Sequence, residues 1–224
     1  MRLVGSNGEV TEKAIRRAAV EVIAEHGFEA ASLRLIAKEV GIQAPSLYNY
    51  IKSKEQLLFD LLKEPLVSMI AEYKAGAEHL PDPFDRLQLF IGVHLNFHLD
   101  FTQEVFIGNM ELRRLKRPHY KVVTGLRDEY SLMLTKIIEE GAKAGQFQVD
   151  DARVTTFALL AMLSGVCNWY RPDGPLSKDA IVRIHTKLAM QMLGLPATAH
   201  TDKAVRDVAN EPKRRKRAVT ASVA

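Results

Sequence analysis

Apolar residues recur at helical spacing along most of this chain, and no stretch combines strict apolar–polar alternation with the β-branched residues typical of a strand. Residues that commonly cap helix N-termini stand before several apolar stripes: Ser32, Ser53, Asp82, Asp150 and Ser177. Only 7% of the 224 residues are aromatic, so the core must be mainly aliphatic. We therefore expect an all-α protein with no sheet.

The same pattern predicts where the helices lie. They are expected at residues 11–26, 33–40, 43–50, from 53 onward, 83–99, 102–115, 119–144, 151–170 and 178–194. Gly27 and Gly41 are expected to end the first two helices in the left-handed conformation. Pro65 should end or kink the fourth, because proline removes a helical hydrogen bond. We expect three parts: a three-helix head (1–54), a helical body (55–195) and a disordered basic tail (196–224).

The net charge of the chain does not by itself indicate DNA binding. The net charge is +4, but residues 196–224 alone carry seven basic and three acidic groups, including the run KRRKR at 213–217. The folded part therefore has no basic excess, and DNA binding must be argued from local pattern. A single cysteine, Cys167, and the lack of a signal-like or membrane-spanning segment lead us to expect a cytoplasmic protein that does not contact membranes.

Residues 33–52 satisfy the steric requirements of two helices that cross steeply about a tight turn. A small residue, Ala37, stands where the helices approach, and Gly41 supplies the turn. Apolar residues occupy the positions that such a unit buries: Ile36, Val40, Ile42, Leu47 and Tyr50. This agreement predicts a helix-turn-helix.

The outer face of the second helix of this unit favours nucleic acid. No acidic residue occurs between Gly41 and Lys54, and hydrogen-bonding side chains recur there, namely Gln43, Ser46, Tyr48, Asn49, Lys52 and Lys54. Gln and Asn can bond adenine edges in a major groove, while hydroxyls and lysines hold phosphates. The alternative is that these residues are simply solvated polar groups on a short helix.

At this point the chain resembles the tetracycline-repressor (TetR) family of bacterial regulators. The resemblance rests on the runs ASLRLIAKEVGI at residues 31–42 and SLYNYIKSKE at 46–55, preceded by His26, Gly27 and Phe28. It implies that Ser32 and Arg34 meet the DNA backbone or base edges. It further implies that a second set faces the groove (Gln43, Ala44, Pro45, Ser46 and Asn49) and that Tyr48 and Lys54 grip phosphates. Gln43, Pro45, Tyr50 and Ile51 depart from the common family pattern, so the operator sequence is not readable from the chain.

The C-terminal half resembles the branch of this family that contains repressors of sterol and fatty-acid catabolism. The motifs that carry the resemblance are ELRRL at 111–115, RDEY at 127–130, GQF at 145–147 and WYRPDGPL at 169–176. The similarity implies an acyl-coenzyme A thioester as inducer. Residues 154–168 contain no Lys or Arg, so the helix predicted there offers no cation to a coenzyme A phosphate. The expected inducer-binding residues are His94, Phe97, His98, Met110, Arg113, Tyr130 and Trp169; the alternative for each is core packing or, for Arg113, a surface ion pair.

Other kinds of site have less support. His94 and His98 are spaced as in a metal site, with Glu104, Glu111 or His119 as a third ligand, but no Cys/His cluster accompanies them and we expect no metal. Glycine-rich phosphate loops and the Gly-x-Ser-x-Gly motif are absent from the sequence, so we expect neither a cofactor nor an enzyme.

The two last predicted helices carry more apolar residues than one core needs. The helix at 151–170 is apolar nearly all round, and the helix at 178–194 carries a matching stripe. We therefore expect a homodimer through these helices; the alternative is a core within one chain.

The sequence as a whole predicts a homodimeric repressor that binds a palindromic operator and is released by a small molecule. The alternative is an all-helical enzyme or carrier with no role in DNA binding.

Overall fold

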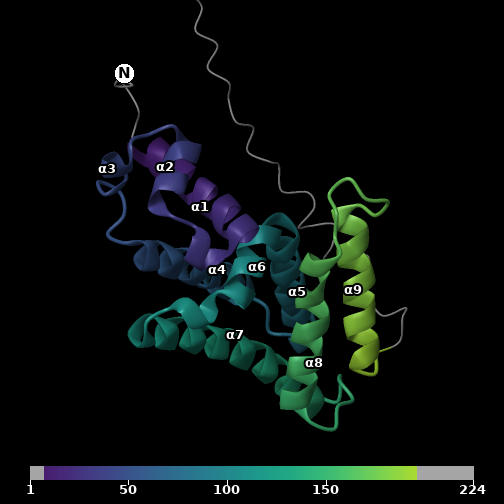
Figure 1. Cartoon of the computed structure of the whole chain (residues 1–224). Coiled ribbons are helices and arrows are strands. Elements are labelled where there is room, and N and C mark those ends of the chain that lie inside the picture. The colour runs from purple at the N-terminus through teal and green to yellow at the C-terminus, as the bar shows by residue number, and fades with distance from the viewer. Residues whose placement is uncertain (1–7, 196–224) are drawn as a thin grey trace, which may run out of the picture.

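The computed structural model describes residues 8–195, which form nine α-helices, two short 3₁₀ helices and no strand. The all-α prediction is therefore confirmed for this part of the chain, and the predicted tail at 196–224 lies outside the described residues. Three helices form the head at one end of the molecule: α1 (Gly8–Ala30), α2 (Leu33–Val40) and α3 (Ala44–Leu47) (Figure 1). No helix within residues 8–195 is both long and apolar enough to span a bilayer.

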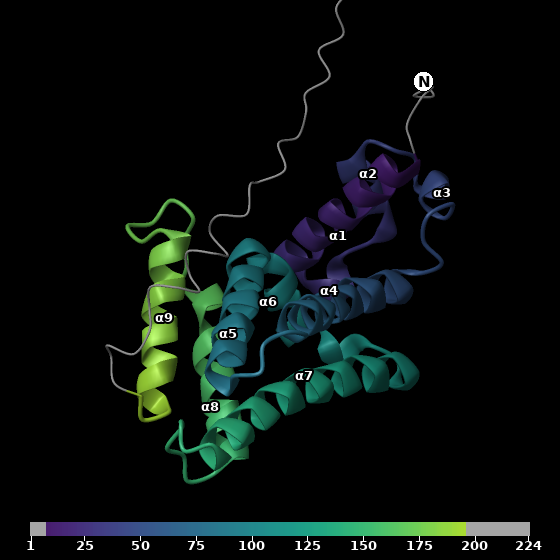
Figure 2. The ribbon, with the colours of Figure 1, turned by 180° about the vertical axis from the view of Figure 1, so that it is seen from behind.

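Six further α-helices form the body. They are α4 (Lys54–Ala77), α5 (Pro83–Asp100), α6 (Thr102–Met110), α7 (Arg117–Lys143), α8 (Ala152–Ser164) and α9 (Lys178–Met192), with the 3₁₀ helices η1 (Leu112–Arg114) and η2 (Gly165–Asn168) between them. Helix α4 lies between the head and α7, while α5, α8 and α9 pack together at the far end (Figure 2). Helix α4 is thus the element that joins the head to the body.

Local sequence signals placed most helix ends correctly. Ser32, Ser53, Asp82 and Ser177 each accept a hydrogen bond from a backbone N–H in the first turn of their helix. The sequence predicts Asp150 as the cap of α8, but the structure shows that the cap is the next residue, Asp151. Gly41 ends α2 with φ 76°, and its neighbour Ile42 donates to the carbonyl of Ala37 at 2.9 Å.

Five expected elements differ from the structure. Gly27 has the expected positive φ of 76°, but it kinks α1, which continues to Ala30. Helix α4 continues through Pro65, because the surrounding packing outweighs the loss of one helical hydrogen bond. The regions expected at 102–115 and 151–170 each form an α-helix followed by 3₁₀ residues. Helix α3 is only four residues long, and residues 48–50 continue it as a turn.

The buried apolar residues form two clusters. One fills the body between α4, α5, α7, α8 and α9. The other lies under the head, but it also includes Leu57, Leu61 and Leu62 of α4 and Ile107 of α6. The apolar core of the head therefore extends into the body across the predicted boundary at residue 54, and a movement of α4 or α6 reaches the head through packed side chains.

Candidate DNA-binding surface and ligand cavity

The turn between α2 and α3 holds α3 on the surface of the head. Leu47 is fully buried and anchors α3 to the core below. Of the predicted groove-facing residues, Gln43, Pro45, Ser46 and Asn49 are exposed and Ala44 is half-buried. Tyr48, predicted to contact phosphate, is exposed beside them. Tyr48 is 61% exposed, far more than a tyrosine held by packing. The residues predicted around α3 are therefore accessible from solvent, apart from the half-buried Ala44.

Ser32 and Arg34 are both exposed at the start of α2, on the same head. The Ser32 hydroxyl accepts a hydrogen bond from the backbone N–H of Leu35 at 3.1 Å, so its oxygen already caps the helix. Its hydroxyl proton can still be donated to a phosphate. A role in positioning DNA is therefore compatible with the cap, and both residues stay candidates.

Lys54 is less free than its sequence position indicates. Its Nζ donates to the carbonyl oxygens of Phe28 at 2.7 Å and of Glu29 at 3.2 Å, and it lies 4.3 Å from the centroid of the Phe28 ring. Two of its three N–H groups are therefore used to join α4 to the end of α1. Sequence reasoning missed this contact because Phe28 and Lys54 are 26 residues apart.

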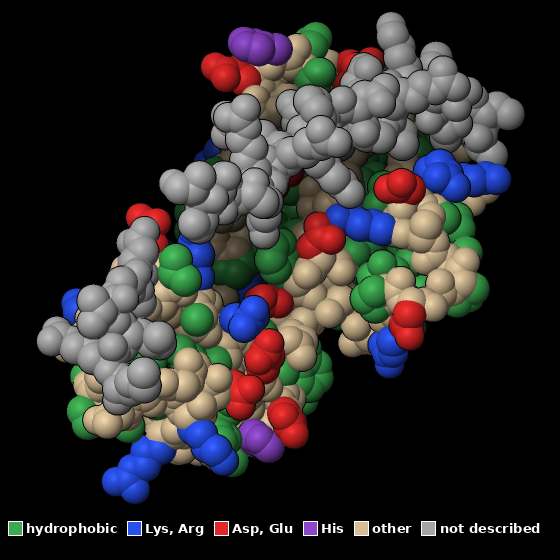
Figure 3. Space-filling view, turned by 90° about the horizontal axis from the view of Figure 1, so that it is seen from above, with side chains coloured by type: hydrophobic (Ala, Val, Ile, Leu, Met, Phe, Trp, Pro, Cys, Tyr) green, Lys and Arg blue, Asp and Glu red, His purple; other side chains and the backbone are tan. Residues whose placement is uncertain are grey.

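The surface charge offers no dominant patch on the face shown in Figure 3. Lys and Arg side chains are interspersed with Asp and Glu there, and hydrophobic side chains lie between them. This agrees with the sequence argument that bulk charge carries no case for DNA binding. The argument for DNA binding rests instead on the exposed polar side chains around α3.

A second set of contacts joins the head to the segment between α6 and α7. The Glu111 carboxylate accepts a hydrogen bond from the backbone N–H of Phe28 at 3.1 Å, next to the kink at Gly27. The Glu55 carboxylate accepts from the N–H of Lys116 at 3.0 Å and from His119 Nδ1 at 2.9 Å. Burial by itself raises the pKa of Glu55, but these two hydrogen bonds outweigh it and the net pKa is lowered. The segment 111–119 is therefore part of the junction between head and body.

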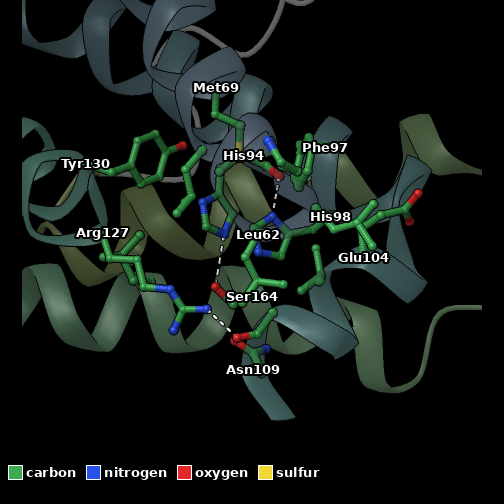
Figure 4. A pocket seen from close by; sticks show the side chains of 16 residues that line it. Leu62, Met69, His94, Phe97, His98, Glu104, Asn109, Arg127, Tyr130 and Ser164 are labelled. Atoms are coloured by element: carbon green, nitrogen blue, oxygen red, sulfur yellow. Dashed lines mark hydrogen bonds between the residues drawn. The ribbon is translucent and has the colours of Figure 1, made fainter. Parts of the chain in front are cut away.

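The body contains a cavity of about 230 Å³ beside this junction. Five helices line it, and most of the lining is apolar (Figure 4). The lining residues are Leu61, Leu62, Pro65, Leu66 and Met69 of α4; His94, Phe97 and His98 of α5; Glu104, Val105, Gly108 and Asn109 of α6; Arg127 and Tyr130 of α7; and Leu160 and Ser164 of α8. The cavity is closed on one side by α4, the helix that carries the head.

Four of the seven predicted inducer-binding residues line this cavity: His94, Phe97, His98 and Tyr130. The other three do not. Met110 is 63% exposed at the end of α6, and Arg113 is exposed on η1. Trp169 is 50% exposed and stacks on His185. Arg113 and Trp169 lie beyond the early ends of α6 and α8, on η1 and directly after η2. Met110 is the last residue of α6 itself and is exposed to solvent.

The α4 and α6 walls were missed by sequence reasoning. Leu61, Leu62, Leu66 and Met69 are indistinguishable from core residues in a helical pattern. One residue of the α4 wall, Pro65, was singled out from the sequence, as the place where this helix should end or kink, and it lines the cavity. Arg127, which donates to the carbonyl of Gly108 at 2.7 Å, lies within the RDEY motif that we had noted only as a resemblance.

The histidines of the cavity are neutral and do not form a metal site with a third residue. Burial lowers the pKa of His98 to about 4, and burial together with the neighbouring His98 lowers the pKa of His94 well below its usual range. Their rings stack at 3.9 Å between centroids. In residues 8–195 no three His, Cys, Asp or Glu side chains gather as metal ligands. Glu111 and His119, two of the expected third ligands, are bonded at the junction described above.

An exposed helix-turn-helix, carried on a helix that also walls an internal cavity, defines a DNA-binding regulatory protein. Two family models match the chain: "Bacterial regulatory proteins, tetR family" over residues 15–61 and "Tetracyclin repressor-like, C-terminal domain" over residues 81–193. The chain therefore belongs to the tetracycline-repressor (TetR) family of bacterial transcriptional regulators.

Individual relatives extend this comparison. The repressor KstR2 of Mycobacterium tuberculosis is 27% identical over 165 residues, which cover 73% of this chain and 82% of KstR2. The solved structure of that ketosteroid regulator aligns with a TM-score of 0.75 over 86% of this chain and 97% of its own. The fatty acid metabolism regulator of Bacillus subtilis is 28% identical over 131 residues, 58% of this chain and 68% of the regulator.

A more distant structure shares the fold alone. It is AibR in complex with isovaleryl coenzyme A and operator DNA, at 22% identity and a TM-score of 0.71, over 80% of this chain and 97% of AibR.

Proposed function

We propose that this protein is a homodimeric repressor that binds a palindromic operator and is released from it by an acyl-coenzyme A. The observation that carries the proposal is the position of the cavity, because α4 forms one of its walls and also holds the head. A ligand that fills the cavity acts on α4 directly. Because a repressor acts on chromosomal DNA, we place it in the cytoplasm.

DNA binding is assigned to the exposed face around α3. Gln43 and Asn49 are proposed to contact base edges, with Ala44, Pro45 and Ser46 packed along the groove. Tyr48 is proposed to contact phosphate. Ser32 and Arg34 are proposed to fix the position of α2 on the backbone. Lys54 remains a weaker phosphate candidate, since two of its donors are already used within the chain.

The dimer is assigned to the outer faces of α8 and α9. Large apolar side chains are exposed there, namely Val154, Phe157, Ile184, Leu188 and Met192. Such a patch is unusual on a monomer and is typical of an interface. Two copies would form a four-helix interface about a two-fold axis, which would hold the two heads one DNA turn, about 34–36 Å, or a multiple of it apart. Phe157→Glu should shift the sedimentation coefficient to that of a monomer, whereas Val67→Glu, on the exposed side of α4, should not.

The inducer class is supported by the cavity and by the relatives. The lining is mostly apolar, which suits an acyl group, and KstR2 and the B. subtilis regulator are named for ketosteroids and fatty acid metabolism. At about 230 Å³ the cavity is smaller than the roughly 300–1,000 Å³ of drug-sized sites. Among residues 8–195, Arg127 is the one Lys or Arg that lines it, and we therefore place the coenzyme A phosphates outside the cavity.

The mechanism is a population shift. A ligand that fits the cavity only when α4 moves would favour a conformation in which the two heads of the dimer are no longer spaced by whole turns of DNA. The population able to bind DNA would then fall. Linkage requires that DNA weakens inducer binding by the same factor by which inducer weakens DNA binding.

Two experiments test the proposal. A gel-shift with DNA from upstream of the protein's own gene separates a repressor from an enzyme or carrier, which would not retard that DNA. Calorimetric titration with hexanoyl-coenzyme A, with and without the retarded DNA, measures both arms of the linkage. Equal affinities in the two titrations would contradict the mechanism, and failure of acyl-coenzymes A from short-chain to sterol-sized would remove the inducer class while leaving the repressor.

A further inference from the structure

Two polar atoms on the wall of the cavity have no hydrogen-bond partner. They are Nδ1 of His94 and the hydroxyl oxygen of Tyr130, on residues that are only 3% and 4% exposed. Two other buried side-chain atoms of the described residues share this condition, Arg86 Nε and Gln146 Oε1, but neither residue lines the cavity. Burying such a group without a partner is unfavourable, so two of them on residues that line one cavity require an explanation.

Both rings are fixed in place by their neighbours. The other nitrogen of His94, Nε2, is hydrogen-bonded to the Ser164 hydroxyl at 3.1 Å. His98 stacks on His94, and His98 Nδ1 donates to the His94 carbonyl at 2.8 Å. Tyr130 stacks on Phe90 with 4.6 Å between centroids. The two unpartnered atoms are therefore held in position before any ligand binds, which reduces the entropy lost on binding.

The two side chains also lie close to each other. The His94 and Tyr130 ring centroids are 5.9 Å apart, with the rings nearly parallel. Figure 4 shows the Arg127 guanidinium directed toward α6 and away from the Tyr130 hydroxyl. In the part of the chain that the structure describes, no other Lys or Arg lines the cavity to balance an ionised ligand group.

The protonation states define what this pair can bind. Burial lowers the pKa of His94 and raises the pKa of Tyr130, so both are neutral at physiological pH. The contact between His94 Nε2 and the Ser164 hydroxyl fits either tautomer of the ring. We assign the tautomer in which Ser164 donates to Nε2, so that His94 Nδ1 carries the proton and is a donor, like the Tyr130 hydroxyl. Two neutral donors suit one carbonyl oxygen, which has two lone pairs, whereas a buried carboxylate would lack a counter-charge.

We infer that the inducer carries a carbonyl group on its buried, otherwise apolar part, and that its oxygen accepts hydrogen bonds from Tyr130 Oη and His94 Nδ1. This inference rests on the proposed function, because it specifies the ligand of the same cavity. The carbonyl has two possible sources: the thioester itself, or a keto group on the acyl chain.

Three coenzyme A probes distinguish these sources by calorimetry. They are hexanoyl-coenzyme A, its thioether analogue S-hexyl-coenzyme A, which lacks the carbonyl, and 5-oxohexanoyl-coenzyme A, which carries a second one. If the thioester is recognised, the thioether binds roughly tenfold more weakly than hexanoyl-coenzyme A. If a chain carbonyl is recognised, the first two bind alike and the 5-oxo compound binds roughly tenfold more tightly.

The substitution Tyr130→Phe should abolish whichever difference is found, because it removes one donor and leaves the ring. The matched control is Tyr73→Phe, since Tyr73 is also buried and packs edge-on against Phe90 but does not line the cavity. The control should keep the ranking of the three probes. An unchanged ranking in Tyr130→Phe, or equal binding of all three probes to the parent protein, would overturn the inference.

A pair of neutral probes separates this inference from the inducer class. 2-Heptanone and 2-methyl-1-heptene differ only in C=O against C=CH₂, and saturation-transfer NMR can rank them. If no coenzyme A probe binds but the ketone is preferred and Tyr130→Phe removes the preference, the inducer class fails and the carbonyl site stands. If the ketone is not preferred, the carbonyl site fails as well.

The melting temperature of the unliganded protein is a further test. It distinguishes a Tyr130 hydroxyl that binds ligand from one that stabilises the fold. Because the Tyr130 hydroxyl has no partner, Tyr130→Phe should raise the melting temperature while it weakens binding of the carbonyl probes. A lower melting temperature together with an unchanged probe ranking would show that the hydroxyl serves packing and would overturn the inference.

Discussion

The face around α3 and the cavity under α4 both use polar side chains, but in opposite settings. Most of the polar residues around α3 are exposed to water, and they come from seven consecutive positions, 43–49. The cavity residues come from five helices, and two of their polar atoms are buried without partners. A contiguous exposed site can be assigned residue by residue from local pattern, whereas a buried site depends on which distant helices meet.

The largest expected effect tests whether the head is energetically separate from the body. Leu47→Ala should lower the free energy of unfolding by about 2–5 kcal/mol, because it leaves a cavity at a fully buried position. Since the apolar cluster under the head includes residues of α4 and α6, we expect one cooperative transition in urea. Val67→Ala, at an exposed position of α4, should change stability by less than about 0.5 kcal/mol. Two separate transitions would show that the head unfolds alone.

The next effect belongs to the cavity and appears as a pH dependence. Folding lowers the pKa of His98 to about 4, while in the unfolded chain it is about 6.5. Between these values the unfolded state binds more protons, so stability falls as the pH is lowered from 6.5 to 4, by about 3 kcal/mol for this residue alone. Above pH 6.5 the histidine is neutral in both states and contributes no slope.

His98→Gln should reduce this slope, measured as urea midpoints at pH 7, 6 and 5. His26→Gln is the control, because His26 is largely exposed on α1. A parent protein equally stable at pH 7 and pH 5 would contradict the assignment of neutral buried histidines.

A smaller effect is expected at the DNA surface. Gln43→Ala or Asn49→Ala should relax preference at one or two base pairs by about 1–3 kcal/mol, because each removes a contact to base edges. Tyr48→Phe should instead weaken binding to all sequences alike. Competition of single-base operator variants, followed by fluorescence anisotropy, separates the two patterns. If all three variants bind like the parent, the assignment of this face is wrong.

The smallest effect separates a helix cap from a DNA contact. Ser32→Ala and Ser53→Ala each remove a hydroxyl that accepts a hydrogen bond from a backbone N–H, at 3.1 and 3.0 Å, so each should cost about 1 kcal/mol of stability. If Ser32 also donates to phosphate, only Ser32→Ala should reduce DNA affinity beyond what the loss of stability explains. Equal DNA affinities for the two variants would leave Ser32 as a cap alone.

The sequence by itself determined the local features of this protein. Ser32, Ala37 and Gly41 specify the helix-turn-helix because capping, close approach and positive φ depend on neighbouring residues. The helical periodicity likewise predicted the all-α fold and most helix starts.

The tertiary structure decided what depends on distant segments. It ended α6 at Met110 and α8 at Ser164, so that Arg113 and Trp169 do not line the cavity, and it left Met110 exposed at the end of α6. It also attached Lys54 to Phe28 and left Tyr130 Oη without a partner. Hydrogen bonding and burial at these positions depend on how helices far apart in the sequence pack against one another, which no local pattern records.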